Sequence, residues 1–270
     1  MSGRLAVLGT GNMGEAVLAG ALAAGWPADR VVATTTSSDR GQARAEALRE
    51  RYEVETTSDN AAAVKGASLV VLAVKPKDMA GLLEAISQGL ADGVVVASIA
   101  AGLTAAWFEE RLPAGTPVVR AMPNTPAQIG AGVTAIAPGA HATEEHLALV
   151  ESALSGAGTV VRVAEKDIDA VTALSGSGPA YVFYVIDALT EAGVLLGLRR
   201  DVASTLATQT VLGSARLVAE TGEHPVLLRE RVTSPGGTTA AGLRALDDRG
   251  VRAAFLAAAQ AAYDRARELR

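Results

Sequence analysis

The chain contains no cysteine, so disulfide bonds, thiol nucleophiles and cysteine-ligated zinc are excluded. Aromatic residues make up only 3% of the 270 residues, and the net charge is −5. Arginines are scattered and form no basic stripe. A nucleic-acid surface needs clustered positive charge, often with aromatic side chains between the charges, so we expect no nucleic-acid partner.

Long uninterrupted apolar runs are also missing. The longest, residues 182–198, contains Asp187 and Glu191, which predicts a buried helix rather than a membrane span. The first apolar strand begins at residue 4 and leaves no room for a signal peptide. We therefore expect a cytoplasmic protein without a membrane partner.

Histidine is scarce as well. His141 and His146 flank the start of a predicted helix, and His224 lies far along the chain. These positions form no ligand set with the spacing that a metal site requires. The sequence predicts no metal site.

What is present describes an ordinary globular protein, with 49% hydrophobic and 20% charged residues. Over residues 1–164, apolar strands alternate with helical segments, which predicts an α/β Rossmann-type domain with a mostly parallel sheet. From residue 165 to residue 270 only helical segments follow, separated by two glycine-rich loops. We predict an all-α second domain there.

The most informative short motif is the glycine turn after the first strand, in which Gly9, Gly11 and Gly14 have the spacing G-x-G-x-x-G. Gly9 permits the turn, Gly11 lets a pyrophosphate approach the backbone, and Gly14 lets the helix pack on the sheet. The free N–H groups at the helix start attract phosphate. The turn predicts a dinucleotide site, although a purely structural glycine turn is the alternative.

The end of the second strand bears on which dinucleotide binds. An NAD site has an acidic residue there, whereas this chain has hydroxyl residues at 34–38, followed by Asp39 and Arg40. Hydroxyls and an arginine suit a 2′-phosphate, so we favour NADPH over NADH. In the competing interpretations Asp39 is the ribose ligand, or only the N-cap of the next helix.

Three further segments follow predicted strands and are expected at the ligand-binding edge of the sheet. Lys75 precedes Pro76 and is either a solvated strand end or a catalytic lysine. The small residues at 100–102 would let a nicotinamide approach the backbone. Asn124 lies between two prolines, as a rigidly placed polar group or as the cap of a turn.

Five motifs together resemble the pyrroline-5-carboxylate reductase family. They are the glycine turn with Met13, AVKP at 73–76, MPNTP at 122–126, LSGSGPAY at 174–181 and VTSPGGTT at 232–239. The resemblance runs in order from residue 4 to residue 269. The two glycine loops near the C-terminus are its most specific part.

This resemblance implies the NADPH-dependent reduction of 1-pyrroline-5-carboxylate to L-proline, with NADH as the alternative donor. It implies a helical dimerisation domain at 165–270, a homodimer, and further assembly into a decamer. It places the imine between the nicotinamide and the loop at 234–239, where Thr239 contacts the ring nitrogen as the catalytic residue. The implied substrate-binding residues are Glu165, Arg231, Ser234, Gly237, Thr238 and Thr239. Arg231 stands where relatives carry asparagine.

The resemblance also implies a set of cofactor-binding positions. They are Gly9, Thr10, Gly11, Asn12, Met13, Gly14, Thr35, Asn60, Ala73, Val74, Lys75, Pro76, Ile99, Ala100 and Ala101.

Residue chemistry supports the substrate loop independently. A Pro-Gly-Gly segment that opens a helix at Thr238 leaves unpaired N–H groups at the positive end of the helix dipole, which suits a small carboxylate. Reduction of a protonated imine needs no strong side-chain base, in keeping with motifs that lack cysteine and histidine. A β-hydroxyacid-type dehydrogenase would need a helical lysine, and none follows Lys166. A non-catalytic dinucleotide sensor would need no carboxylate site.

Overall fold

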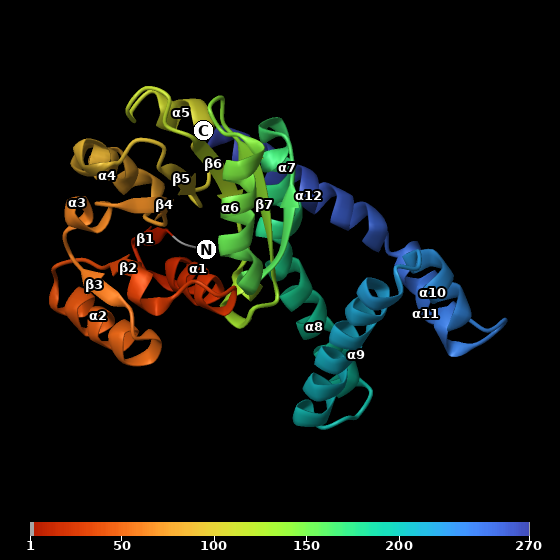
Figure 1. Ribbon diagram of the computed structural model, residues 1–270. Coiled ribbons are helices and arrows are strands. Elements are labelled where there is room, and N and C mark those ends of the chain that lie inside the picture. The colour runs from red at the N-terminus through yellow and green to blue at the C-terminus, as the bar shows by residue number, and fades with distance from the viewer. Residues whose placement is uncertain (1–2, 270) are drawn as a thin grey trace. The chain divides into compact units, whose positions relative to one another are not determined.

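The computed structural model describes residues 3–269, which fall into two compact units (Figure 1). Of the described residues, the first unit comprises 3–177 and 262–269, and the second comprises Gly178–Ala261. The first unit thus extends past the predicted domain boundary at 164 and 165. That boundary stays a prediction.

The first unit is built on one eight-stranded sheet. Its strands are β1 (Arg4–Leu8), β2 (Val31–Thr34), β3 (Glu55–Thr57), β4 (Ala67–Leu72), β5 (Val95–Ser98), β6 (Val118–Met122), β7 (Gly132–Pro138) and β8 (Gly158–Arg162). They lie in the order β3-β2-β1-β4-β5-β6-β7-β8. All neighbouring pairs are parallel except β6 and β7. The predicted mostly parallel α/β fold is confirmed.

Helices connect most of these strands. The α-helices of the first unit are α1 (Asn12–Ala23), α2 (Asp39–Tyr52), α3 (Asn60–Ala63), α4 (Pro76–Ile86), α5 (Ala105–Glu109), α6 (Glu144–Leu154) and α7 (Ile168–Val171). Short 3₁₀ turns are η1 (Ala28–Arg30), η2 (Ser87–Gly89), η3 (Thr125–Ile129), η4 (Ser155–Ala157) and η5 (Glu165–Asp167), and a π-helical turn is η6 (Thr172–Gly176). The described residues after η5 contain helices and no strand, as predicted.

The central strands β1 and β4 are apolar on both faces, because helices cover both sides of the sheet there. In β1, Leu5 and Val7 join a fully buried core with residues of α1, α2 and α6. The alternate residues Ala6 and Leu8 pack with α3, α4 and α5 on the opposite face. This doubly wound arrangement places the carboxyl ends of β1, β4 and β5 at one edge of the sheet. Ligands bind at that edge in open α/β sheets.

Polar side chains fix where several helices begin. Ser38, not Asp39, caps α2: its hydroxyl accepts a hydrogen bond from the Gly41 amide at 3.3 Å, and Asp39 is the first helical residue. The interpretation of Asp39 as the N-cap is therefore wrong. His146 serves as a cap residue of α6, because its Nδ1 accepts from the Thr143 amide at 3.1 Å.

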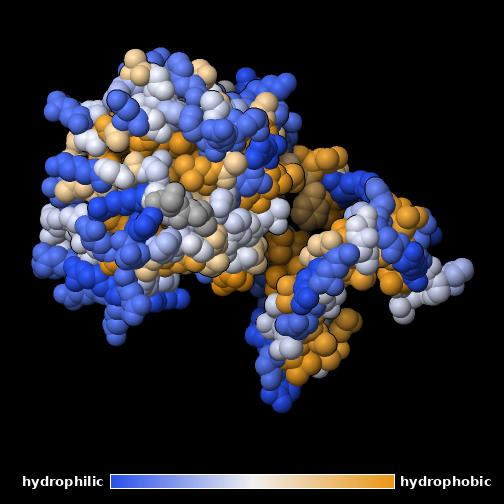
Figure 2. All heavy atoms as spheres, viewed as in Figure 1, coloured by the Kyte–Doolittle hydropathy of each residue, from blue (hydrophilic) through white to orange (hydrophobic). Residues whose placement is uncertain are grey.

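The second unit contains α8 (Gly178–Leu195), α9 (Arg200–Thr221), α10 (Pro225–Arg231), α11 (Thr238–Asp248) and the start of α12 (Val251–Glu268). Helices α8 and α9 approach closely: a Cβ on Gly193 would lie 2.8 Å from the Ala203 Cβ. Few apolar side chains are buried in this unit. Phe183 is 61% exposed and Leu206 54%, and Figure 2 shows hydrophobic residues on the surface of these helices. No helix in the described part of the chain is long and apolar enough to cross a membrane.

Close packing of α1 against η4 gives a test of the fold. A Cβ on Gly20 would lie 2.7 Å from the backbone nitrogen of Ala157. We expect Gly20→Ala to lower the free energy of unfolding by about 1 to 3 kcal/mol, because backbone must move to admit the methyl group. Chemical denaturation measures this.

The matched control is Gly81→Ala in the middle of α4, where an added Cβ meets no atom within 4 Å. Here alanine should raise the free energy of unfolding by about 0.5 to 1 kcal/mol, through helix propensity alone. Equal effects of the two substitutions would contradict the close packing at Gly20.

Candidate functional site

A cavity of about 930 Å³ opens beside the glycine turn and the ends of β2 and β4. Nine predicted cofactor residues line it: Gly9, Thr10, Gly11, Asn12, Thr35, Asn60, Ala73, Val74 and Lys75. They come from segments that are far apart in the sequence. The fold therefore brings most of the predicted dinucleotide residues together in one unit.

The geometry of the turn gives each of its glycines a different role. Gly9 has a φ of +91°, and a Cβ there would lie 2.7 Å from the Val74 Cγ1. A Cβ on Gly14 would lie 2.3 Å from the Gly9 carbonyl oxygen, so α1 begins in direct contact with the turn. A Cβ on Gly11 would meet no atom within 4 Å. Only Gly11 leaves open space in front of the helix start.

The end of β2 is hydrogen-bonded to this turn. The buried Thr34 hydroxyl accepts from the Gly9 amide at 3.0 Å, and the Thr34 carbonyl accepts from the Thr10 amide at 2.9 Å and hydroxyl at 2.8 Å. These bonds fix the turn before any ligand binds. Thr34 thus supports the turn, while Thr35 is the partly exposed residue beside it.

A polar cluster holds helix α2 against the same turn. Glu15, in the first turn of α1, accepts hydrogen bonds from Arg44, from Arg51 at 3.2 Å and from Tyr52 at 3.0 Å. Burial raises the pKa of the Tyr52 hydroxyl, and its hydrogen bond to Glu15 raises it further. Arg44 also donates from Nε to the Thr10 carbonyl at 3.1 Å. The cluster therefore positions α2 beside the cavity.

Several residues lining the cavity were not in the predicted set. They are Thr34, Thr36, Ser37, Arg40, Gly41, Ala43, Arg44, Ser58 and Asp78. Residues 34–40 carry the hydroxyl and arginine pattern that favoured a 2′-phosphate. No signal in the sequence indicated Arg44 or Ser58, because only the packing of α2 and the path after β3 bring them to the cavity.

The charges around the cavity are mostly positive. Arg40 and Lys75 are exposed and make no ion pair with any residue that the structure describes. Arg44 is paired with Glu15, and Asp78 contributes one negative charge. Two unpaired cations beside hydroxyl groups and free helix amides have the chemistry that suits phosphate groups. The residues present therefore fit a dinucleotide that carries a 2′-phosphate.

Other predicted cofactor residues do not line the cavity. Met13 packs against a small cluster around Ala127, and Pro76 is the first residue of α4. Ile99, Ala100 and Ala101 follow β5 at the same edge of the sheet, where Ala100 is 8% exposed and donates to the Ser98 hydroxyl. Their contact with a cofactor stays a prediction.

The predicted substrate loop lies in the second unit and ends at the start of α11. The Gly237 amide donates to the Ser234 carbonyl at 3.0 Å, and Gly236 has a φ of +70°. A proline at the second position and a left-handed glycine at the third are features of a type II turn. The turn leads directly into α11, which no side chain caps. The amides of Thr238 and Thr239 are therefore available at the helix start.

Two other predicted substrate residues take part in ion pairs. Glu165 Oε1 accepts from the Ala105 amide at 2.6 Å and from Arg120 at 3.1 Å, and the Arg120 side chain is only 4% exposed. Arg231, exposed at the end of α10, pairs with Glu223 through both of its terminal nitrogens at 2.7 and 2.5 Å. The contacts of Glu165 and Arg231 with a substrate stay predictions.

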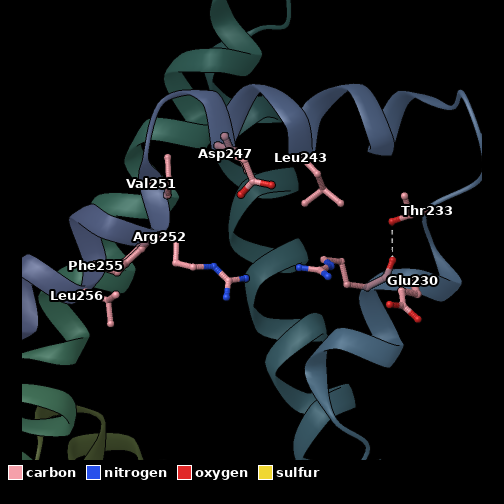
Figure 3. Close-up of a pocket in the computed structure, with 10 residues that line it drawn as sticks. Glu230, Thr233, Leu243, Asp247, Val251, Arg252, Phe255 and Leu256 are labelled. Atoms are coloured by element: carbon pink, nitrogen blue, oxygen red, sulfur yellow. Dashed lines mark hydrogen bonds between the residues drawn. The ribbon is translucent and has the colours of Figure 1, made fainter.

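A second cavity of about 550 Å³ lies among α10, α11 and α12. Leu243 and Asp247 point into it from α11, and Arg252 reaches in from α12 (Figure 3). The Thr233 hydroxyl donates to the Arg229 carbonyl at 2.6 Å beside it. None of the predicted site residues lines this cavity. Its apolar side chains are part of the exposed hydrophobic surface of the helical unit.

Comparisons with known proteins match both halves of the chain. Residues 165–269 match the family model described as "Pyrroline-5-carboxylate reductase dimerisation". Residues 4–102 match a second family model, described as "NADP oxidoreductase coenzyme F420-dependent". The pyrroline-5-carboxylate reductase of Corynebacterium melassecola is 46% identical over 268 residues, covering 98% of each chain. The reductase of Mycobacterium tuberculosis is 46% identical over 290 residues, covering 99% of this chain and 97% of the relative.

Solved structures agree. A pyrroline-5-carboxylate reductase from Coxiella burnetii has a TM-score of 0.94 and 38% identity, over 100% of this chain and 99% of that one. A pyrroline carboxylate reductase from Plasmodium falciparum, solved with NADP bound, has a TM-score of 0.86 and 28% identity, over 99% and 98% of the two chains.

The glycine turn provides a test that separates binding from folding. Gly11→Ala should weaken dinucleotide binding by about tenfold or more, because a methyl group would occupy the space through which a phosphate reaches the amides. The melting temperature should stay unchanged, since that space is open. Titration of the dinucleotide by fluorescence measures the affinity.

Gly14→Ala is the contrasting variant, because its methyl group would collide with the Gly9 carbonyl. It should lower the melting temperature markedly. If Gly11→Ala also destabilises the protein, or leaves dinucleotide affinity unchanged, the assignment of open space at Gly11 to a phosphate is wrong.

Proposed function

The chain belongs to the pyrroline-5-carboxylate reductase family, and we infer that it catalyses the reaction for which its relatives are named, the reduction of 1-pyrroline-5-carboxylate to L-proline. NADPH is the hydride donor, and the reaction completes proline biosynthesis. The observation that carries this inference is the combination, in one chain, of a phosphate-binding cavity with the uncapped helix start behind the Ser234–Gly237 hydrogen-bonded turn. A dinucleotide sensor would need only the first of these.

We propose that the glycine turn and the residues around its cavity hold the cofactor. The amides at the start of α1 would receive the pyrophosphate, and Gly11 gives them access. Arg40, with the hydroxyls of Thr36 and Ser37, would bind the 2′-phosphate. The relative from Plasmodium falciparum was solved with NADP bound, in keeping with this choice.

The imine carboxylate is assigned to the helix start at Thr238 and Thr239. Backbone N–H groups there are not used by a side-chain cap, and the helix dipole favours a negative charge. Ser234 and Gly237 shape the turn, because a Cβ on Gly237 would lie 2.4 Å from the Ser234 Oγ. We propose that Thr239 hydrogen-bonds the ring nitrogen and so fixes which face of the imine is reduced.

When bound, NADPH supplies a hydride to the imine carbon of the substrate. The ring nitrogen enters already protonated and leaves as a secondary amine, so the chain need not provide a strong base. The protein's contribution is to orient the ring and to exclude water. This explains how the reaction proceeds in a site without cysteine or histidine among its motifs.

We also propose that the enzyme is a homodimer formed through the helical region, with a decamer as a further assembly. Residues 165–269 match a dimerisation model, and the second unit leaves large apolar side chains exposed. The cavity lined by Leu243 and Phe255 is part of that surface. The cytoplasmic location and the division at residues 164 and 165 remain predictions of the sequence.

The reaction itself is tested with purified protein, pyrroline-5-carboxylate and NADPH, followed by the loss of nicotinamide absorbance. Thr239→Ala should reduce kcat/KM by about tenfold to a hundredfold through loss of one hydrogen bond, with NADPH affinity unchanged. Thr239→Ser should recover much of the activity. Thr205→Ala, a threonine on α9 with its hydroxyl bonded to the Asp201 carbonyl, is the control.

A folded protein that binds NADPH but does not oxidise it with this imine would exclude the proposed reaction. Normal turnover by Thr239→Ala would remove only Thr239 from the mechanism.

Cofactor choice is tested at Arg40. Arg40→Ala should raise the KM for NADPH by about tenfold, because one charge-assisted contact to the 2′-phosphate is lost, and should leave the KM for NADH unchanged. Arg49→Ala, on the same helix but outside the cavity, is the control. An equal loss with both cofactors would place Arg40 away from the 2′-phosphate.

A further inference from the structure

Asn124 is a buried polar residue two positions after β6, and both the oxygen and the nitrogen of its side-chain amide make hydrogen bonds. It is 9% exposed. Its Oδ1 accepts from the Val133 amide at 2.9 Å, and its Nδ2 donates to the Ser175 carbonyl at 3.2 Å. The interpretation of this side chain as the cap of a turn is wrong, since it makes no capping bond to η3. The side chain instead joins three segments of the first unit.

One of these segments is the π-helical turn η6. The Ser177 amide donates to the Thr172 carbonyl at 2.8 Å, the bond to the fifth residue that defines a π-turn. In an α-helix the Ser175 carbonyl would accept from residue 179. That residue is Pro179, which has no N–H. The Asn124 amide supplies a donor to the carbonyl that proline leaves without its helical partner.

The π-turn lies directly on the end of β6. A Cβ on Gly176 would be 2.8 Å from the Met122 Cε. Met122 itself packs with Ala135 and Ile168. Strand β6 is parallel to its neighbour β5, so its carboxyl end lies at the same edge of the sheet. Ligands bind at that edge in open α/β sheets. The contact of Asn124 therefore fixes the position of η6 at this edge.

We propose that Asn124 is a positioning residue for the reduction, which holds η6 at the end of β6 in the arrangement that hydride transfer requires. This rests on the proposed function. The phosphate cavity is lined by segments after β1, β2, β3 and β4 and not by Asn124 or η6. Loss of the contact should therefore impair turnover and leave cofactor affinity intact. A small misplacement near reacting atoms is costly to rate.

Asn124→Asp is the most direct test, because it keeps the shape and the acceptor for Val133 but places an oxygen against the Ser175 carbonyl. We expect kcat to fall by about tenfold to a hundredfold, with the dissociation constant of NADPH within about twofold of the wild type. Gln128→Glu makes the same change of amide to acid on an exposed residue of η3 and should behave as wild type.

Two readouts separate positioning from general destabilisation. A protonated acid can donate to Ser175 as the amide does, so the deficit of Asn124→Asp relative to wild type should shrink as the pH falls. In the Pro179→Ala background residue 179 regains an N–H, so the added loss caused by Asn124→Asp should be smaller. If Asn124→Asp does not fold, Asn124→Ser, whose shorter side chain cannot serve both partners, replaces it in the Pro179→Ala comparison.

Hydrogen exchange over residues 172–180 tests the contact without any activity. Faster exchange there in Asn124→Asp, with unchanged exchange in β1 and α1, would support the part of the proposal in which Asn124 holds η6 in place. This result does not depend on which imine the enzyme reduces. Wild-type kcat in the folded variant, or a loss of NADPH affinity equal to the loss of kcat, would overturn it. A wild type inactive toward pyrroline-5-carboxylate would instead count against the proposed function.

Discussion

The close approach of backbone to backbone at the end of β1 is the constraint on which the first unit depends. Helix α1 begins so near the strand end that a Cβ on Gly14 would lie 2.3 Å from the Gly9 carbonyl. This contact sets the direction of α1, and Gly20 lets the same helix pack on η4. Thr34 and Glu15 then fix β2 and α2 to the turn. The cavity is a consequence of this packing, because its walls are the elements that the turn holds in place.

Backbone amides at helix starts are the shared chemistry of the two proposed binding sites. At α1 the amides face a cavity with Arg40 and Lys75, which suits phosphate groups. At α11 they follow a turn of proline and glycine, with the hydroxyls of Thr238 and Thr239, which suits one small carboxylate. In both proposed sites a glycine, which has no side chain, would give an anion access to the backbone. Hydride transfer to a protonated imine requires the protein to orient the imine against the nicotinamide, and it does not require a side-chain base.

The two units differ in how they bury apolar surface. The sheet unit has two complete cores, one on each face, with Leu5 and Leu8 fully buried on opposite sides. The helical unit buries little more than Thr190, Ala203 and Ala207, while residues such as Tyr184 and Leu196 are largely exposed. Exposed apolar area on this scale indicates association with a partner. The match of residues 165–269 to a dimerisation family agrees with this exposed apolar surface.

The order of elements, the glycine turn and the change from strands to helices near residue 165 followed from the sequence, because periodicity, glycine spacing and proline act within a few residues. The same local rules allowed Asp39 and Asn124 as caps, and both of these interpretations were wrong. Two neighbouring polar residues compete for one cap at Asp39, and the Asn124 amide reaches a distant partner. Only tertiary structure decided that Arg44 and Ser58 line the cavity, and that Glu165 pairs with Arg120. It also decided that Asn124 takes the place of the N–H missing at Pro179. Such contacts join residues separated by tens of positions, and no local pattern in the chain records them.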